Sequence, residues 1–352
     1  MNKMPSISVN YVSARPTYGA MIGLEDTHLL APTLESLRHQ TFGDFEFVCV
    51  DLLYEKRPEM FEAWDLPFPV KHISARPDWW LEHGVWSGSA PRNKGIVAAD
   101  DETELIVIVD DCCEFGPEFL QLFWDWYDKG YFAMALTLYN KGGKPLYHRG
   151  NEAVEAIGNS EGVSQGELTA AEKLDILYKR GERVRDSRWR FVEASRGTYY
   201  PPPKMYYGYS SISMEAAYRV NGFDEKMDGD KSLIDVDMGL RLSQAGYLFV
   251  LDRNLTVTEN SHCSVPSDVL FWDGGTLKSN YNIMNLSHEK GRWKANSYRL
   301  SEEEVNWILT HRDTLEKHIP VYPEDSKHHK LLMEWAENHQ SVFDLRELRL
   351  LS

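Results

Sequence analysis

A short apolar run that ends in two aspartates is the feature that most constrains the fold of this chain. Residues 105–109 read Leu-Ile-Val-Ile-Val, and Asp110 and Asp111 follow directly. β-Branched residues in such a run predict a fully buried strand. Ionised carboxylates are costly to bury alone, so we expect a counter-charge beside them, such as a ligand or a metal. The alternative is a strand-end turn with two solvated aspartates.

Strands and helices alternate along the first third of the chain. Apolar runs predict strands at residues 6–12, 45–50, 70–73 and 105–109, and helical spacing predicts helices at residues 32–40, 92–99 and 117–128. This alternation favours βαβ units and a mixed, mostly parallel central sheet flanked by helices, an α/β fold. Two of the strands end in an aspartate, Asp51 and Asp110, so both carboxylates are expected at the ligand-binding edge of one sheet.

The second half of the chain is expected to complete one large domain over residues 1–287. Turn-rich, charged and proline-rich segments mark residues 139–207 as an insertion on the main sheet, with a charged helix over residues 170–183. After it, the pattern predicts a helix over residues 234–245 and strands at residues 247–251 and 255–258. Gly246 follows that helix, where a residue without Cβ is favoured.

Residues 288–352 are expected to form a helical C-terminal extension. Its first sign is a capping-box pattern that begins at Ser301 and has Glu304 three residues later. The last residues, 334–351, predict a terminal helix.

Charge and cysteine content exclude several classes of protein. The net charge is −16, which argues against binding nucleic acid or an anionic membrane through a general positive field. The four cysteines include no CxxC pair, which argues against a structural zinc site and favours a reducing, cytoplasmic setting.

No signal-peptide core and no apolar run of transmembrane length is seen, so a soluble protein is expected. The sequence predicts no oligomeric state.

Four motifs occur in an order that carries a resemblance. They are residues 34–51, which end in Val-Cys-Val-Asp; Arg92-Asn93-Lys94-Gly95; the strand with Asp110-Asp111; and residues 222–246, which contain Gly-Phe-Asp-Glu and Asp235-Val-Asp237. In this order the chain resembles the family 2 glycosyltransferases, which have the Rossmann-like GT-A fold, over residues 5–262 apart from the insertion. The resemblance implies transfer of a sugar from a UDP- or GDP-sugar to an acceptor hydroxyl, with inversion, helped by Mn²⁺ or Mg²⁺.

The resemblance also assigns residues to the donor nucleotide. Asp51 would accept a hydrogen bond from the base, Tyr11 would stack on it, and Arg15 would contact the base or a phosphate. Arg92 and Asn93 lie near a predicted helix start, where backbone N–H groups favour anions. Other interpretations remain: Asp51 as a turn residue, Tyr11 as a core residue and Asn93 as a helix cap.

The metal ligands implied by the resemblance depart from the usual pattern of the family. Asp110 and Asp111 occupy the place of the DxD motif, and His262 would be a third ligand. Cys112 stands where the second Asp of that motif is expected, and a thiol is a poor ligand for Mg²⁺. Either Asp111 is then the direct ligand or metal binding is weakened.

Asp235 occupies the place of the catalytic base, counted back from Arg241, and Asp237 would assist it. Ile234 replaces the leading Glu of the family motif, a second departure. The alternative is that both aspartates are helix-start acids, which the helix dipole favours.

Two other functions compete with the transferase. A sugar-nucleotide pyrophosphorylase would need a glycine-rich basic loop after the first strand, and the Ser-Ala-Arg-Pro sequence at residues 13–16 lacks glycine. A non-catalytic nucleotide- or carbohydrate-binding protein would suit the two departures. The family serves polysaccharide and glycoconjugate synthesis, so the implied acceptor is a glycan, a lipid-linked molecule or a protein. The resemblance also implies that the insertion over residues 139–207 lies on the acceptor side.

Overall fold

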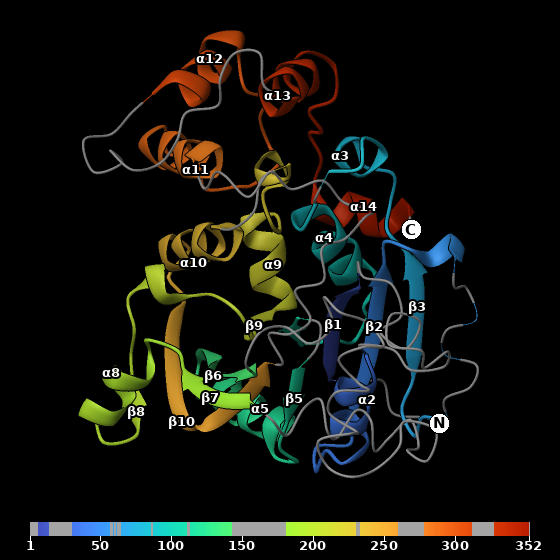
Figure 1. The fold of residues 1–352 in the computed structure, drawn as a ribbon, viewed down its shortest axis with the longest axis vertical. Coiled ribbons are helices and arrows are strands. Elements are labelled where there is room, and N and C mark those ends of the chain that lie inside the picture. Colours follow the sequence, from blue (N-terminus) through green and yellow to red (C-terminus); the bar gives the residue numbers. More distant parts are fainter. Residues whose placement is uncertain are drawn as a thin grey trace.

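A mixed ten-stranded sheet forms the centre of the computed structural model, with helices on both faces (Figure 1). The structure describes residues 6–13, 30–56, 59, 61, 65–85, 87–110, 113–142, 181–229, 233–259, 278–311 and 327–351. The strands follow the order β3-β2-β1-β4-β9-β6-β10-β5, and β7 pairs with β6 while β8 pairs with β10. The α/β fold class predicted from the alternating elements is therefore confirmed.

The described strands are β1 (Ile7–Ser13), β2 (Phe45–Asp51), β3 (Val70–Ser74), β4 (Leu105–Val109), β5 (Cys113–Phe115), β6 (Tyr131–Gly142), β7 (Gly181–Arg185), β8 (Thr198–Tyr199), β9 (Ser210–Ser213) and β10 (Leu248–Glu259). The α-helices are α2 (Ala31–Arg38), α3 (Trp79–Glu82), α4 (Ser89–Ala98), α5 (Phe119–Asp128), α8 (Trp189–Ala194), α9 (Met214–Val220), α10 (Ile234–Gln244), α11 (Lys278–Glu289), α12 (Glu302–Thr310), α13 (Lys327–Asn338) and α14 (Leu345–Leu351). Short 3₁₀ turns are η1 (Tyr54–Lys56), η4 (Pro203–Met205) and η5 (Glu225–Met227).

The parallel strands β3, β2, β1 and β4 bring two predicted carboxylates to one edge of the sheet. In the register of β1, Ser13 lies beside Asp51, and Tyr11 lies beside Val109. Asp110 follows Val109, so the two aspartates stand at the carboxyl ends of β2 and β4, the parallel strands on either side of β1. This shared edge agrees with the expectation drawn from the two strand ends.

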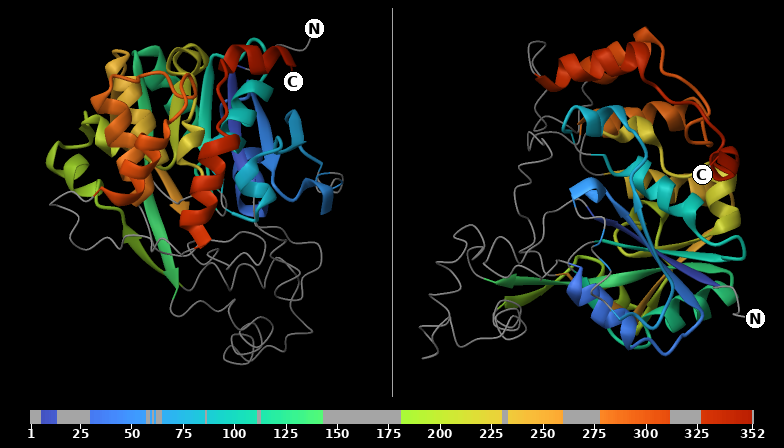
Figure 2. Two further views of the ribbon diagram at one scale, coloured as in Figure 1. Left: turned by 90° about the horizontal axis from the view of Figure 1, so that it is seen from above. Right: turned by 90° about the vertical axis from the view of Figure 1, so that its right-hand side faces the viewer.

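Strand β4 is buried on both faces because it separates two apolar layers. Leu105, Val107 and Val109 pack into the core beneath α2 and α5, whereas Ile106 and Ile108 pack into the core beneath α4, α9 and α10. The alternation follows the two-residue period of a strand. A third apolar cluster joins α3 to α11, α12 and α13, which form an outer layer beyond α10 (Figures 1 and 2).

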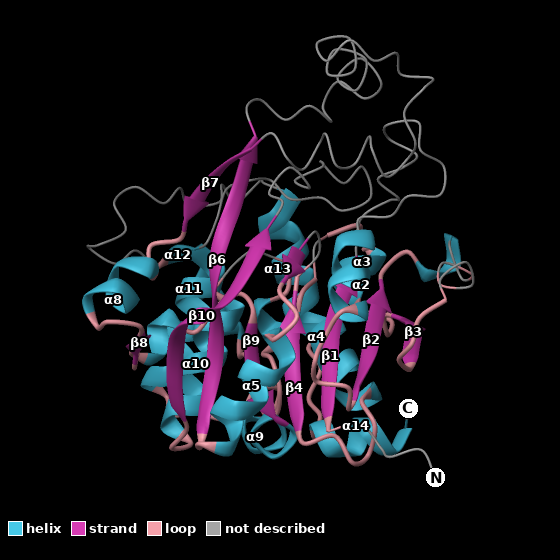
Figure 3. Cartoon of the chain, turned by 90° about the horizontal axis from the view of Figure 1, so that it is seen from below, coloured by secondary structure: helices cyan, strands magenta, loops and turns pink. Residues whose placement is uncertain are grey.

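Within residues 139–207, the described part adds the end of β6, β7 and β8 to the main sheet, together with α8 and η4. Strands β6 and β7 pair antiparallel and extend past the neighbouring strands (Figure 3). The prediction of a charged helix over residues 170–183 is wrong at its C-terminal end, because residues 181–183 belong to β7 and pair with β6. Its remainder lies outside the described residues.

Two further boundaries differ from expectation. The strands expected at residues 247–251 and 255–258 are one strand, β10, with a register shift between Leu251 and Thr256. The terminal helix expected over residues 334–351 is two helices, because the Gln340 amide hydrogen-bonds both backbone groups of Leu300 and draws the intervening chain away. The Ser301–Glu304 capping box is confirmed.

Helix α11 spans residue 288, where the sequence suggested a boundary. Among the described residues, no helix has the length and apolar character needed to cross a membrane.

Candidate functional site

An ion pair joins the end of β4 to helix α4 at the carboxyl edge of the sheet. The Arg92 Nη2 donates to Asp110 Oδ1 over 3.0 Å. The Arg92 side chain is 11% exposed, whereas the Asp110 side chain is 43% exposed. The guanidinium is therefore fixed inside the protein, and the carboxylate it holds faces solvent.

Asp235 joins this pair from the first turn of α10. Burial raises the pKa of its carboxyl and the charge of Asp110 adds to the rise, while Arg92 and a backbone hydrogen bond from Gly208 oppose it. Burial acts to lower the pKa of Arg92, but Asp235 and Asp110 outweigh it, so that pKa is raised. Arg92 forms its ion pair with Asp110, and its charge acts on the Asp235 carboxyl group as well. Asp235 holds a proton more readily than an ordinary aspartate.

The backbone that delivers Asp235 is in an unusual conformation. Leu233 precedes α10 with φ of 67°, in the left-handed region that non-glycine residues rarely adopt. Such conformations cluster at functional sites because the surrounding structure must hold them.

A carboxylate of the chain itself covers the start of α4, where the sequence suggested an anion site. Asp228 accepts hydrogen bonds from the backbone N–H groups of Gly88, Ser89 and Ala90 over 2.9, 2.7 and 2.9 Å, and from the Ser87 hydroxyl over 2.9 Å. These are the N–H groups that a bound phosphate would need. The diphosphate is therefore not expected at this helix end. Sequence reasoning missed Asp228 because its partners lie 138 to 141 residues away.

Asn93 holds a turn of the chain rather than facing an open site. It lies within α4, so it is not a helix cap. Its Oδ1 accepts from Phe223 N over 2.8 Å, and its Nδ2 donates to Phe223 O and Glu225 Oε1, each over 2.9 Å. With 1% exposure and both amide ends engaged, Asn93 is placed as a clamp on the turn before η5.

The two residues predicted to hold the base are enclosed in the structure. Asp51 Oδ1 accepts from Leu53 N over 2.9 Å, and Oδ2 lies 3.0 Å from His72 Nε2. Tyr11 is fully buried and packs against Phe47 with ring centroids 5.7 Å apart. These are the placements of a turn residue and a core residue, the alternatives that the sequence offered. Sequence reasoning missed His72, because it lies 21 residues from Asp51 and only the pairing of β3 with β2 brings the two side chains together.

Asp237 points into a buried charge network, although it is only two residues from Asp235. It pairs with Arg241, which also donates to Asp224 over 2.9 Å. Asp224 in turn accepts from Lys226 over 3.0 Å. Burial acts to raise the pKa of Asp224, but Lys226 and Arg241 outweigh it and hold that pKa well below its usual range. This placement suits Asp237 to hold α10 in position.

The remaining predicted residues, Arg15, Asp111 and His262, lie outside the described residues, as does Cys112. Within the described ranges, no three His, Cys, Asp or Glu side chains are grouped so as to hold a metal ion. Of the three predicted ligands, Asp110 is the one that the described residues include, and it suits a divalent cation because it has hard oxygen donors, it is exposed, and Arg92 engages its Oδ1.

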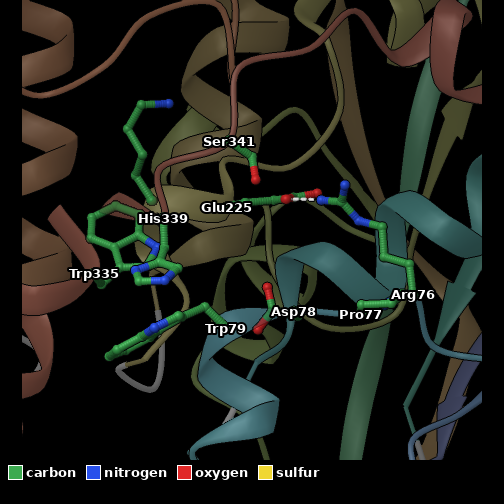
Figure 4. Close-up of a pocket in the computed structure, with 9 residues that line it drawn as sticks. Arg76, Pro77, Asp78, Trp79, Glu225, Trp335, His339 and Ser341 are labelled. Atoms are coloured by element: carbon green, nitrogen blue, oxygen red, sulfur yellow. Dashed lines mark hydrogen bonds and ion pairs between the residues drawn. The ribbon is translucent and has the colours of Figure 1, made fainter. Parts of the chain in front are cut away.

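A separate polar cavity lies between α3, η5 and α13 (Figure 4). Its volume is about 50 Å³, and it is lined by Arg76, Pro77, Asp78, Trp79, Glu225, Lys226, Trp335, His339 and Ser341. An Arg76–Glu225 ion pair spans one side of it. Because a single water molecule takes about 30 Å³ of liquid volume, this cavity has no room for a sugar nucleotide.

Comparison with known proteins supports the fold. No protein-family model and no curated protein sequence matches the chain. Among solved structures, GalNAc-T7 with UDP, GalNAc and Mn²⁺ is similar, with a TM-score of 0.50, 14% identity, and coverage of 99% of this chain and 57% of that one. S. aureus TarS has a TM-score of 0.44 and 13% identity over 86% of this chain and 42% of its own. TarS 1–349 in complex with UDP-GlcNAc has a TM-score of 0.45 and 13% identity over 86% of this chain and 70% of its own.

The chain thus spans about half the length of TarS and GalNAc-T7. At these identities the likeness shows the fold alone, and that fold is GT-A, as the motif order implied.

Proposed function

We propose that this protein is a glycosyltransferase of the family 2 type that moves a sugar from a nucleotide diphosphate donor to an acceptor hydroxyl with inversion. The observation that carries the proposal is the cluster of Asp110, Arg92 and Asp235 at the carboxyl edge of a GT-A sheet. It combines a fixed cation, an exposed carboxylate and a partly buried carboxyl group in one place. UDP-sugars are the first donors to test, because GalNAc-T7 was solved with UDP.

In this proposal Asp235 is the general base. Its carboxylate takes the proton of the acceptor hydroxyl while the acceptor oxygen forms a bond to the anomeric carbon and the bond to the diphosphate oxygen breaks. A raised pKa suits this role, since a base works best when its pKa lies near the working pH. Asp237 is assigned a supporting role, because its contact with Arg241 fixes the helix that carries Asp235.

Arg92 is assigned to the leaving group. A buried guanidinium forms strong charge-assisted bonds with phosphate oxygens and needs little reorganisation during the reaction. Asp110, together with Asp111 and His262, would hold Mn²⁺ or Mg²⁺, which neutralises charge on the diphosphate when bound. The acceptor is proposed as a glycan, a lipid-linked molecule or a protein.

The test is Asp235→Asn, assayed for sugar transfer and for UDP binding. Transfer should fall by about 10²–10⁴-fold, the usual contribution of a general base, while UDP affinity is kept. Asp252→Asn is a matched control, because Asp252 is also a buried aspartate, held by Trp126 Nε1 and Asn254 N. Transfer by Asp235→Asn at the unmodified rate would overturn the base assignment. UDP binding without transfer or donor hydrolysis would favour a non-catalytic binding protein.

A further inference from the structure

The segment from Gly222 to Gly229 contacts Arg92 and the first turn of α4, the helix that carries Arg92. Asn93, the neighbour of Arg92 on α4, clamps one end of the segment through the backbone of Phe223. The Arg92 guanidinium lies over the Phe223 ring, with its Cζ atom 5.6 Å from the ring centroid. At the other end, Asp228 takes the first N–H groups of α4. One stretch of chain thus contacts both the guanidinium of Arg92 and the start of its helix.

Two glycines allow this segment to approach so closely. Gly222 has φ of 71°, and a Cβ there would lie 2.3 Å from Asn93 Oδ1. Gly229 has φ of 92°, and a Cβ there would lie 2.7 Å from the Trp80 ring. Both positions require a left-handed backbone and leave no space for a side chain. The segment is therefore built to fit against α3 and α4.

Asp228 reaches Arg92 through Gly88. The N-cap of α4 is Gly88, which has no side chain to satisfy the first N–H groups, so Asp228 does so from a distant part of the sequence. Gly88 O accepts from Arg92 Nη1 over 3.4 Å, and Arg92 Nη2 then reaches Asp110. The charge of Asp228 also acts on Arg92, adding to the rise in its pKa that Asp235 and Asp110 produce against the opposing effect of burial. Asp228 itself is 3% exposed and does not face the open side of the cluster.

From this chain of contacts we propose that Asp228 is a positioning residue for Arg92, which fixes the first turn of α4 so that the guanidinium stands ready for the donor diphosphate. The proposal rests on the proposed function, in which Arg92 binds that diphosphate. Burial raises the pKa of Asp228, whereas the four hydrogen bonds to its two oxygens oppose that rise and favour the ionised carboxylate. An asparagine would place an NH₂ donor against backbone N–H or hydroxyl donors and leave at least one of them without an acceptor.

The test compares Asp228→Asn, Arg92→Ala and the double variant by calorimetric titration with UDP and by transfer kinetics. Asp228→Asn should weaken UDP binding by roughly tenfold or more, because small displacements of a positioned group are costly. The double variant should bind UDP no more weakly than Arg92→Ala alone, since both changes remove one interaction. Asp252→Asn, a buried aspartate away from α4, should leave UDP affinity unchanged.

Additive effects of the two substitutions would overturn the proposal, because a merely structural role would weaken binding independently of Arg92. If Asp228→Asn fails to fold, Ser87→Ala provides the same test, since it removes one of the four hydrogen bonds to Asp228. It should weaken UDP binding by roughly two- to fivefold, the usual effect of one hydrogen bond. Unchanged affinity in Ser87→Ala would count against the proposal.

A crystal structure of Asp228→Asn, or of Ser87→Ala if that variant alone folds, gives a result that does not depend on the nucleotide. The proposal expects a displaced first turn of α4 and an Arg92 guanidinium moved away from Asp110. An unchanged pair at 3.0 Å would overturn the role of Asp228. Failure of the unmodified protein to bind UDP or GDP would instead overturn the proposed function, so the two failures are distinguishable.

Discussion

Two clusters of aspartate and basic side chains meet at helix α10, and they differ in how their charges are matched. In the inner cluster, Asp224 and Asp237 face Lys226 and Arg241, and every one of these side chains is at most 2% exposed. In the outer cluster, Arg92 pairs with Asp110 and its charge also acts on Asp235, and the Asp110 side chain is 43% exposed. A buried cluster with balanced charges is suited to hold the fold. A partly exposed cluster with a shared cation is suited to bind a ligand.

The largest effect that separates the clusters is expected from Asp224→Ala. This substitution leaves Lys226 and Arg241 buried with one fewer carboxylate, and removing one partner of a buried pair costs about 3–5 kcal/mol. Urea denaturation should show a loss of this size in the free energy of unfolding. A loss below about 1 kcal/mol, which is typical of exposed pairs, would mean that the inner cluster is not a scaffold.

The next effect is a pH dependence at Asp78, which caps α3 beside Asp228. Burial raises the pKa of Asp78 to about 7, and repulsion from Asp228 adds to the rise, against Arg76 and two backbone N–H groups. Because the folded protein holds this proton more tightly than the unfolded chain, the free energy of unfolding should fall as pH rises from near 4 to about 7. The other titratable groups around the same cavity are Glu225, Lys226 and His339.

Asp78→Asn should remove this contribution, since its amide oxygen can still accept the bonds from Trp80 N and Leu81 N. Denaturation series at several pH values should show the variant more stable than the unmodified protein above pH 7, with the advantage lost toward pH 4. A variant less stable at every pH would show that the ionised carboxylate stabilises α3.

The smallest effect on stability is expected from Asp110→Asn in the outer cluster. The Asp110 carboxylate is exposed, and pairs of this kind contribute about 0–1 kcal/mol. Urea denaturation of Asp110→Asn beside Asp224→Ala tests the comparison directly. A loss as large as that from Asp224→Ala would place Asp110 in the scaffold.

The sequence predicted what depends on local patterns. The five-residue run before Asp110 indicated a buried strand, and the spacing of Asp51 and Asp110 placed both at one edge. These predictions succeed since strand periods and strand-end positions are set by neighbouring residues.

Other features depend on contacts between distant segments, and the sequence carried no signal for them. Asp228 accepts from backbone N–H groups 138 to 140 residues away, and a backbone N–H has no sequence signature. Asn93 carried a motif signal for the nucleotide, yet its amide is engaged by a turn 130 residues away. The motif assigned different roles to Asp235 and Asp237, but it carried no signal that Asp237 pairs with Arg241 in the inner cluster, because that contact depends on the packing of α10.

The most direct test of the proposed site is a calorimetric titration of the unmodified protein and Asp110→Asn with UDP and GDP, with and without Mn²⁺. The account predicts that the unmodified protein binds one of these nucleotides more tightly with Mn²⁺, and that Asp110→Asn loses about tenfold or more in affinity, a difference of about 1.4 kcal/mol or more, while remaining folded. Absence of binding by the unmodified protein under all conditions, or equal affinity of Asp110→Asn, would contradict the account.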